Sequence, residues 1–575
     1  MKLSVRFSDT KQMKHVVAIA VACSVLFLPG CIPNLRNPEP GLNRLPEGFR
    51  GTSSPDNSAK VNVEEFYTDP MLICLIHQAM SPIGNRELKI LNEEVQVARA
   101  EILGRSGAYL PFLTAGANAG LNRTSRFTET GAGILDDPFL PGQHFTNPFG
   151  NYLGGINLSW QLDIYRQLRN ARDAAAQRYA VASERRNFFV TRLVAEIAEN
   201  YYGLMALDAR LENLNRIIAL QERSLEIARA RFQGARGSDL DVQRFLAEVR
   251  NNQSQKLIVN QDIIQAENRI NFLVNRFPQP VERKSAGFPD FFDLQIHDLS
   301  VGVPSELLLN RPDVRQAERD LVAAGLDVKV ARVNFFPQLA ITGGVGLNSY
   351  VISHLFEPNA VIGDITGGLV GPLFNFRLIQ AQYLTADARQ LQALYSYQRV
   401  ILEAVTDVVN RITKVVNFAR SIEIRKQQVK ALETAVEDAT SLYQNPRAGV
   451  SIDYLDVLTA QNALFDAIKD LIDTKGEQLA AVANTYQALG GGLPPIFKSA
   501  TDVILPPLPH LSGPPSPVGP PPPLPPGPPP HGAAAVRAPA MPATAPNDMK
   551  NPDAKPDDPK TLQPKSGIEL PPALP

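Results

Sequence analysis

The sequence contains little cysteine and little net charge, and each shortage excludes a class of protein. Its 575 residues include three cysteines, and the formal net charge is −1. Cys23 lies in an N-terminal leader and Cys31 in a lipidation motif, so Cys74 would have no partner for an internal disulfide. The apolar setting of Cys74 predicts a buried core residue. Near-neutral charge argues against a nucleic-acid binder, which normally carries a basic face.

Long hydrophobic runs are also lacking. After residue 30, no stretch reaches the roughly 18 apolar residues of a membrane-spanning helix. A membrane role for the mature chain would therefore use strands, a surface helix or a lipid.

Sequence motifs of catalysis are absent as well. The seven histidines are scattered, and HExxH, GxxxxGK[ST] and GxSxG do not occur. The step Arg311-Pro312-Asp313 is better explained as a helix start, with Pro312 in the first turn and Asp313 at the positive end of the helix dipole. We therefore expect no catalytic residue, no metal site and no cofactor, and the chain is not predicted to be an enzyme.

The N-terminus has the pattern of an export signal. Four basic residues among the first 14 precede the apolar run VVAIAVACSVLFLPG and then Cys31. The tetrapeptide that ends in Cys31, Leu-Pro-Gly-Cys, resembles a lipobox, although proline is unusual in it. We predict that residues 1–30 are a signal peptide and that Cys31 carries acyl chains such as palmitate, which would supply membrane affinity. The alternative is cleavage nearby with Cys31 unmodified.

Two segments outside the helical part have their own character. Residues 31–61 would follow the lipid as an extended segment. Residues 493–575 hold 27 of the 48 prolines in the chain. Proline at this density removes backbone donors and favours the extended polyproline conformation, so this tail is predicted to be disordered.

The rest of the chain is an internal duplication. The stretch YLPFLTAGANAGLN has a near-copy, FFPQLAITGGVGLN, 226 residues later. Alternating apolar and polar residues predict strands at about 110–122 and 152–163 in the first half, and at about 336–348 and 364–375 in the second. In both halves the predicted order is helix, two strands, a very long helix, a turn and a shorter helix.

The long helices carry a heptad stripe. Residues 373–445, for example, contain neither glycine nor proline. About 68 helical residues would span about 100 Å, which is more than a globule needs, so such a helix crosses a space. Apolar residues step by three and four, as in a coiled coil: Leu204, Leu207, Leu211, Leu214 and Ile218 in one half, and Val405, Val408, Ile412, Val415, Ala419 and Ile422 in the other.

Each strand-like run has about 10 residues, the length of a tilted strand that crosses a bilayer. Four strands cannot close a membrane barrel, and open edges inside lipid are not tolerated. If these are membrane strands, several chains must share one barrel. The alternative is a small soluble sheet that caps a coiled coil.

These features resemble the outer membrane factors, the TolC-like exit ducts of tripartite efflux pumps, and most closely their OprM/NodT-type lipoprotein branch. The matching segments are VPSELLLNRPDVRQAERDL, YLPFLTA, FFPQLAITGGVG, LSWQLDIYRQLRNAR and DYLDVLTAQNAL, and the resemblance covers roughly residues 62–491. It implies two efflux-protein repeats, 62–290 and 303–492, in a mainly helical fold with a membrane β part. Three chains would form a 12-stranded β-barrel and a 12-helix tunnel.

The resemblance also implies a function and partners. The homotrimer would be a passive conduit, lipid-anchored in the outer membrane and extending into the periplasm. A periplasmic membrane-fusion adaptor would open it and connect it to an inner-membrane pump of the RND type. The alternative is a lipid-anchored periplasmic coiled-coil structural protein without a channel.

The resemblance finally implies site residues. The turns at 234–243 and 445–458 would be the periplasmic tips, which meet the adaptor and close the channel at rest. Thr459 stands where many relatives have a carboxylate, so the gate charge would either lie on Asp453 and Asp456 or be weakened. The tip and gate residues would be Gly237, Asp241, Gly449, Asp453, Asp456 and Thr459. In the first strand, Leu113, Ala115, Ala117, Ala119 and Leu121 would face lipid, and Thr114, Asn118 and Asn122 the pore.

Overall fold

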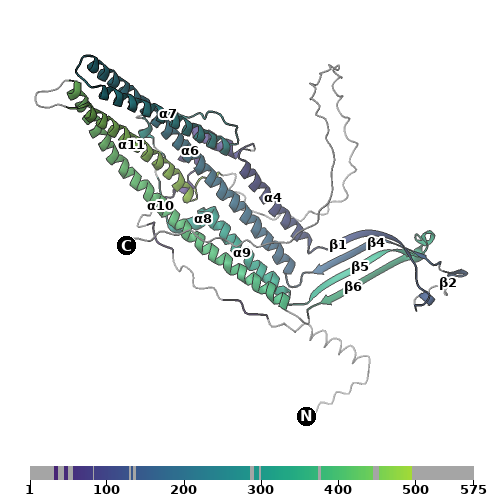
Figure 1. The fold of residues 1–575 in the computed structure, drawn as a ribbon. Helices are drawn as coiled ribbons and strands as arrows, with labels where there is room; N and C mark the ends of the chain where they lie inside the picture. The colour runs from purple at the N-terminus through teal and green to yellow at the C-terminus, as the bar shows by residue number, and fades with distance from the viewer. Residues whose placement is uncertain are drawn as a thin grey trace, which may run out of the picture. The chain divides into compact units, whose positions relative to one another are not determined.

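A computed structural model gives the fold of the chain (Figure 1). The predicted signal peptide, Cys31, Gly449 and most of the predicted tail lie outside the residues that it describes. The described residues belong to one of the chain's two units, Met1–Ile504, and the second unit, Leu505–Pro575, lies outside them. They are 32–36, 45–49, 56–81, 83–128, 131–133, 138–144, 146–284, 290–294, 296, 299–372, 377–444 and 452–494.

The first repeat opens with short capped helices. A 3₁₀ turn, η1 (Ser58–Lys60), is followed by α2 (Val63–Phe66), α3 (Pro70–Met80) and α4 (Arg86–Gly107). Asp69 caps α3 by accepting a hydrogen bond from the Met71 amide at 2.9 Å. Asn85 caps α4 in the same way, through the Leu88 amide at 3.1 Å. Each cap satisfies a backbone donor that the first helical turn leaves free, which fixes where the helix begins.

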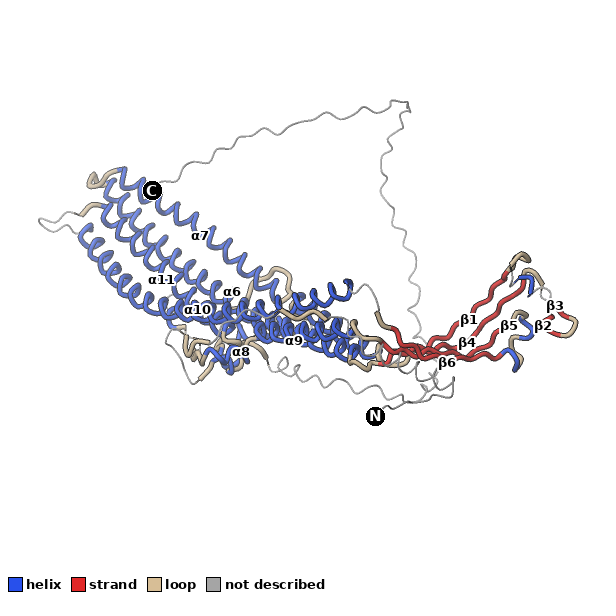
Figure 2. The backbone as a smooth tube through the Cα atoms, turned by 90° about the horizontal axis from the view of Figure 1, so that it is seen from below, coloured by secondary structure: helices blue, strands red, loops and turns tan. Residues whose placement is uncertain are grey.

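Two very long helices dominate the fold. They are α6 (Gln167–Gln233, 67 residues) and α10 (Arg377–Gln444, 68 residues). Each is followed by a 35-residue returning helix, α7 (Asp239–Leu273) or α11 (Tyr454–Ala488). The helices run side by side in both views (Figures 1 and 2).

The connection between the repeats leads into a second short set of helices. It contains η2 (Asp290–Asp293) and η3 (Pro304–Glu306), followed by α8 (Leu307–Asn310) and α9 (Pro312–Val333). Proline occupies the first position of α9 and Asp313 lies in its first turn, as the sequence predicted.

The strands form one antiparallel sheet at the end of the helices (Figure 2). Its order is β1 (Phe112–Asn122), β4 (Phe149–Leu162), β5 (Gln338–Ser349) and β6 (Val361–Val370). The fourth strand begins three residues earlier than the sequence suggested and ends at Val370, because Gly371 and a proline that cannot donate a ladder hydrogen bond follow it. The loops beyond the sheet hold a small hairpin, β2 (Pro138–Leu140) with β3 (Gln143–His144), and the turns η4 (Ile352–His354) and η5 (Pro358–Ala360).

The helices form a layer in which α6 is central and α10 lies at the edge. Helix α6 packs against α4, α7, α9 and α11, whereas α10 packs mainly against α9 and α11. Near the sheet the order is therefore α4, α6, α9, α10. Toward the tips it is α7, α6, α11, α10. Sheet and helices thus share one design: four elements side by side, with an open edge at each end of the row.

A core rich in aromatic side chains packs in the middle of the helical layer. Phe66 stacks on Tyr486 with ring centroids 3.9 Å apart, and the Tyr201 hydroxyl donates to Asp69 at 2.7 Å. Burial, with the charge of Asp69, raises the pKa of Tyr201. Cys74 does not belong to this core: it is exposed on α3, so the prediction that it is buried was wrong. The neighbouring side chains that fill the core are Leu72, Leu75 and Ile76.

Among the described residues, no helix combines the length and the apolar composition needed to cross a bilayer.

Candidate functional site

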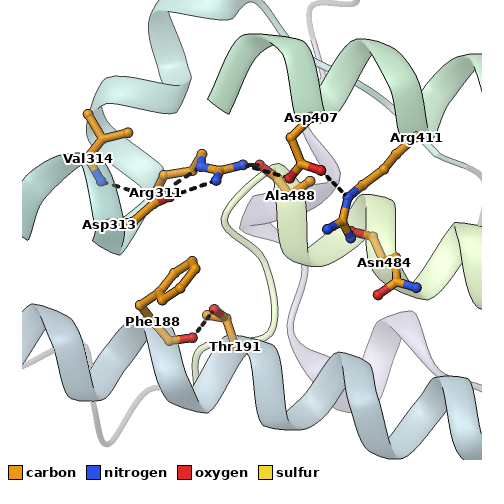
Figure 3. Close-up of polar contacts among 9 residues, drawn as sticks. All are labelled: Phe188, Thr191, Arg311, Asp313, Val314, Asp407, Arg411, Asn484 and Ala488. Carbon is orange, nitrogen blue, oxygen red and sulfur yellow. Dashed lines mark hydrogen bonds and ion pairs between the residues drawn. The ribbon is translucent and has the colours of Figure 1, made fainter. Parts of the chain in front are cut away.

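A charged joint lies where α9 begins and α11 ends (Figure 3). Arg311, the residue before α9, is 6% exposed. Its guanidinium donates to both carboxylate oxygens of Asp313, at 3.0 and 2.7 Å, and to the backbone oxygen of Ala488 at 2.8 Å. A third acidic contact, to Asp407 of α10, is 3.4 Å long. The side chain therefore connects three helices that are far apart in the sequence.

Arg411 of α10 completes the joint. It donates to Asp407 at 2.6 Å and to the backbone oxygen of Asn484 at 2.7 Å. Two cations thus contact the carbonyls of the last turn of α11, the negative end of its dipole. Burial alone would lower the pKa of Arg311, but the hydrogen bonds and charges of Asp313 and Asp407 outweigh burial and raise it. The joint therefore stays charged, and its hydrogen bonds tie α9, α10 and α11 together.

A polar cleft of about 640 Å³ adjoins the joint. Arg311, Asp407 and Arg411 line it together with α6 residues that include Arg192 and Glu196. Phe188 and Thr191 lie on α6, below Arg311 in Figure 3. The Thr191 hydroxyl donates to the Phe188 carbonyl at 2.8 Å. Among the described residues, no group of three or more histidine, cysteine or acidic side chains could hold a metal ion.

The first predicted tip is a tight turn between α6 and α7. Ala235 has a left-handed backbone with φ 55°, and the amide of Arg236 donates back to the carbonyl of Arg231 at 2.8 Å. Packing is tight at Gly237: a Cβ there would lie 3.2 Å from that of Arg231. Ser238 caps α7, and the Asp241 carboxylate accepts from the Ser238 amide at 3.4 Å.

The second predicted tip repeats this capping. Asp453 precedes α11, and the Asp456 carboxylate accepts from the Asp453 amide at 3.1 Å. Asp241 and Asp456 therefore hold equivalent positions, each three residues after the residue that opens a returning helix. Thr459 is exposed one turn further on. Gly449 lies outside the described residues, so the structure places five of the six predicted tip residues.

A contact between the two hairpins was missed by the sequence reasoning. Arg231, near the end of α6, donates to the backbone oxygen of Tyr443, near the end of α10, at 2.7 Å. Its guanidinium also lies 4.3 Å from the centre of the Tyr443 ring. Burial raises the pKa of Tyr443, Arg231 opposes that, and Asp241 and Asp453 add to it. The charges predicted at the gate thus lie close enough to Tyr443 to act on it, although 212 residues separate Arg231 from Tyr443.

The sheet register sorts the strand residues onto two faces, because directly paired residues point the same way. Ala115 pairs with Ile156, Ile156 with Val345, and Val345 with Gly363, which makes one row apolar. The adjacent row is polar: Thr114, Asn157, Gly344 and Asp364. The five residues predicted to face lipid share the first face, and the three predicted to face the pore share the second.

The two outer strands have free edges in the described chain. Strand β1 pairs only with β4, and β6 pairs only with β5. Every residue of β1 is exposed, and so are all residues of β6 except one, which is partly exposed. A sheet that is open on both faces and at both edges needs other surfaces to cover it.

The segment that follows Cys31 lies against the sheet end of the helices. Ile32 packs on a cluster that includes Phe335 and Tyr383. Arg36 donates to Asp387 of α10 at 3.0 Å, and the Asp387 side chain is only 3% exposed. Cys31, which is predicted to carry lipid, is therefore followed at once by residues that contact the first turns of α10, the helix after β6.

Comparison with known proteins agrees with this geometry. The chain matches the sequence model of the family described as "Outer membrane efflux protein" over residues 80–276 and 303–491. It is 24% identical over 477 residues to the cation efflux system protein CusC of Escherichia coli, covering 82% of this chain and 98% of CusC. It is 26% identical over 491 residues to the toluene efflux pump outer membrane protein TtgF of Pseudomonas putida, covering 83% of this chain and 97% of TtgF.

The fold is shared with solved structures as well. The open-state MtrE outer membrane channel of Neisseria gonorrhoeae superposes with a TM-score of 0.67 at 24% identity, covering 80% of this chain and 98% of MtrE. The resemblance inferred from the sequence motifs is therefore confirmed, and the alternative of a structural coiled coil is not favoured. With both repeats matched, the chain belongs to the outer membrane efflux protein family.

Proposed function

We propose that three copies of this chain form a passive exit duct across the outer membrane and the periplasm. The observation that carries this proposal is the pair of open edges, which occur in the sheet and in the helical layer alike. A strand edge cannot remain unpaired in lipid, so β1 and β6 need partners from other copies. Three copies of a four-stranded sheet give 12 strands, above the minimum of about eight for a membrane barrel.

The helical edge points to the same assembly. Helices α6 and α10 are almost equal in length, yet α6 has 24 buried residues and α10 has nine. One large apolar residue of α6 is exposed, compared with six on α10. At about 100° per residue, five of those six fall within about 80° of one another, which makes one stripe along α10: Leu384, Tyr395, Leu402, Val416 and Ile424.

The opposite edge of the layer offers a matching surface. Helix α4 exposes Ile90, Val97 and Leu103, and α7 exposes Leu257, Ile258 and Phe272. Joining the α10 stripe of one copy to the α4 and α7 edge of the next buries both sets and extends the layer into a ring. Three layers of four helices then give a 12-helix tunnel, continuous with the barrel.

The two faces of the sheet fit a water-filled barrel. The apolar face, which carries Leu113, Ala115 and Leu121, faces lipid in this arrangement. The polar face, with Thr114 and Asn118, lines the pore, because strands of a membrane barrel alternate between lipid and lumen.

The tips are the gate and the docking site for a periplasmic membrane-fusion adaptor, which connects the duct to an inner-membrane pump of the RND type. At rest, the Arg231–Tyr443 contact holds the two hairpins of one copy together. An adaptor that binds the open packing more tightly shifts the population toward it. Rings of Asp453 and Asp456 near the constriction favour cations.

Cys31 carries the lipid in this proposal. The next residue, Ile32, lies at the sheet end of α9 and α10, where the barrel meets the helices. Acyl chains on Cys31 would therefore enter the membrane beside the barrel. Cys31→Ala should abolish incorporation of a radioactive fatty acid, and label retained by that variant would show that the lipid is elsewhere or absent.

Conductance of the purified protein in planar bilayers tests the duct, together with its size in detergent. A trimer with ion-conducting openings is expected, whereas a monomer or a silent trimer would favour a structural coiled coil.

The gate is tested with two substitutions of one residue. Asp456→Ala removes both the charge and the helix cap, whereas Asp456→Asn removes the charge and keeps a capping oxygen. If the charge closes the gate, both variants should raise single-channel conductance. If only Asp456→Ala does so, the residue acts through the cap, and if neither does, it is not part of the gate.

A further inference from the structure

One carboxylate stands alone in the sheet. The strands β1, β4, β5 and β6, all fully described, contain a single charged residue, Asp364. It lies near the loop end of β6, three residues after the strand begins. The other strand residues of its face are neutral, and many are small. No strand cation opposes its charge.

The position of Asp364 on the sheet is set by the register. It pairs with Gly344 of β5, which pairs with Asn157 of β4, which pairs with Thr114 of β1. All four therefore share the polar face. The row beside them, toward the loops, runs through Gly116, Gly155, Gly346 and Ile362, so Ile362 is the one residue of this row that carries a side chain.

Gly344 leaves room for two oxygen atoms to converge. A Cβ built on Gly344 would lie 2.8 Å from Oδ1 of Asn157 and 3.5 Å from Oδ1 of Asp364. Both side chains therefore lean over the glycine from the flanking strands. A carboxylate and an amide oxygen on one open patch attract a hydrated cation, because hard cations prefer oxygen ligands.

We infer that Asp364, with Asn157 beside it over Gly344, forms a ring of three cation-attracting sites inside the outer part of the barrel. This inference rests on the proposed trimeric duct, which brings three copies of Asp364 to one level of the pore. The ring is separate from the aspartates of the tips, because strands and tips lie at opposite ends of the long helices. It would raise the local concentration of cations at the outer mouth and exclude anions there.

Side-specific block tests the ring. The probe is hexaamminecobalt(III), a trivalent cation that does not exchange its ligands and so reports on charge alone. It is added to the loop side of single channels in about 10 mM KCl, where the Debye length is about 30 Å. Asp364→Asn should require about tenfold more probe for half-block than the wild type, the lower end of the effect of field focusing on ion concentration.

Matched variants separate charge from structure. Asp364→Glu keeps the charge, so its half-block should occur at the same probe concentration as that of the wild type. Glu357→Gln removes an exposed loop carboxylate that contacts His354 at 2.7 Å, and it should change the block less than Asp364→Asn does. Asp364→Ser combined with Thr366→Asp moves the charge two residues along the same face. This double variant should be blocked at about the wild-type probe concentration. In 1 M KCl, where the Debye length is about 3 Å, the difference should disappear.

The outcomes distinguish this inference from the duct itself. If the wild type forms no trimer and no channel, the proposed function fails. If the wild type conducts and Asp364→Asn is blocked at the same probe concentration, the ring is wrong and the duct stands. Asp364→Ser serves as the neutral variant should Asp364→Asn not assemble.

Discussion

Asn85 in the first repeat and Arg311 in the second hold the same joint with different chemistry. They stand 311 − 85 = 226 residues apart, the offset that also separates the two strand copies. Each precedes a helix that leads to the sheet, α4 or α9. Each side chain donates to the carbonyl of the last residue of a returning helix, Asn85 to Leu273 at 2.9 Å and Arg311 to Ala488 at 2.8 Å.

The difference shows what a duplicated joint has to keep. The carbonyl at the end of the returning helix needs a donor in both repeats, and the amide of Asn85 supplies it without a charge. A buried guanidinium needs counter-charges as well, which Asp313 and Asp407 provide. The topology is therefore conserved between the repeats while the electrostatics differ, and the charged joint should be the more fragile of the two.

Arg311→Ala should have the largest effect. It leaves Asp313 without a cation and Asp407 with Arg411 alone, in a partly buried site, and removing one member of a buried charge pair costs about 3–5 kcal/mol. The check is the unfolding midpoint of the detergent-solubilised protein at fixed concentration, because the stability of an oligomer depends on concentration. Arg311→Lys keeps the charge without the bidentate fork. Its unfolding midpoint should fall between those of the wild type and Arg311→Ala. A loss no larger than that of an exposed arginine would contradict the charged joint.

Asn85→Ala should cost less, about 1–2 kcal/mol. The change removes a helix cap, which is worth about 0.5–2 kcal/mol, and one buried donor to Leu273, but it strands no charge. Asn85→Ser keeps a capping oxygen on a side chain too short to reach the Leu273 carbonyl, so it separates the two contributions. The comparison between the repeats would break if Asn85→Ala were as damaging as Arg311→Ala.

The sequence predicted the helix start at Arg311 but not the joint. Pro312 and Asp313 are local signals, and the structure places both as predicted. The contacts to Asp407 and Ala488 span 96 and 177 residues, and no periodicity records them. The same limit hid the Arg231–Tyr443 contact at the tips.

Strand alternation was the stronger guide, because a period of two assigns residues to faces without any tertiary knowledge. It placed Thr114 and Ala115 on opposite faces, as the register does. The heptad stripe was weaker. Leu204 and Leu214 of α6 are fully buried, whereas Val405 of α10 is only partly covered and Ala419 is exposed. Periodicity shows which face is apolar but not whether its partner belongs to the same chain, and α10 is the edge helix.

Glu184 should give the smallest effect, and one that depends on pH. It lies on α6, 3% exposed, and its carboxylate accepts from Arg315 of α9 at 2.8 Å. Burial raises its pKa, although Arg315, Asn187 and Arg319 partly oppose this. A carboxyl with a raised pKa in the folded state contributes stability at low pH, and that contribution is lost as pH rises through the folded-state pKa.

Glu184→Gln removes this dependence and keeps an oxygen that can accept from Arg315. Between about pH 4 and pH 7, the melting temperature of the variant should therefore rise relative to the wild type. The neighbouring exposed pair, Arg185 with Glu94 of α4 at 3.5 Å, is the matched control. Arg185→Gln should shift the melting temperature little, because exposed ion pairs contribute about 0–1 kcal/mol. A pH-independent difference at Glu184 would mean that Arg315 compensates fully for burial, and the contact of α6 with α9 would then be no more sensitive to pH than its exposed contact with α4.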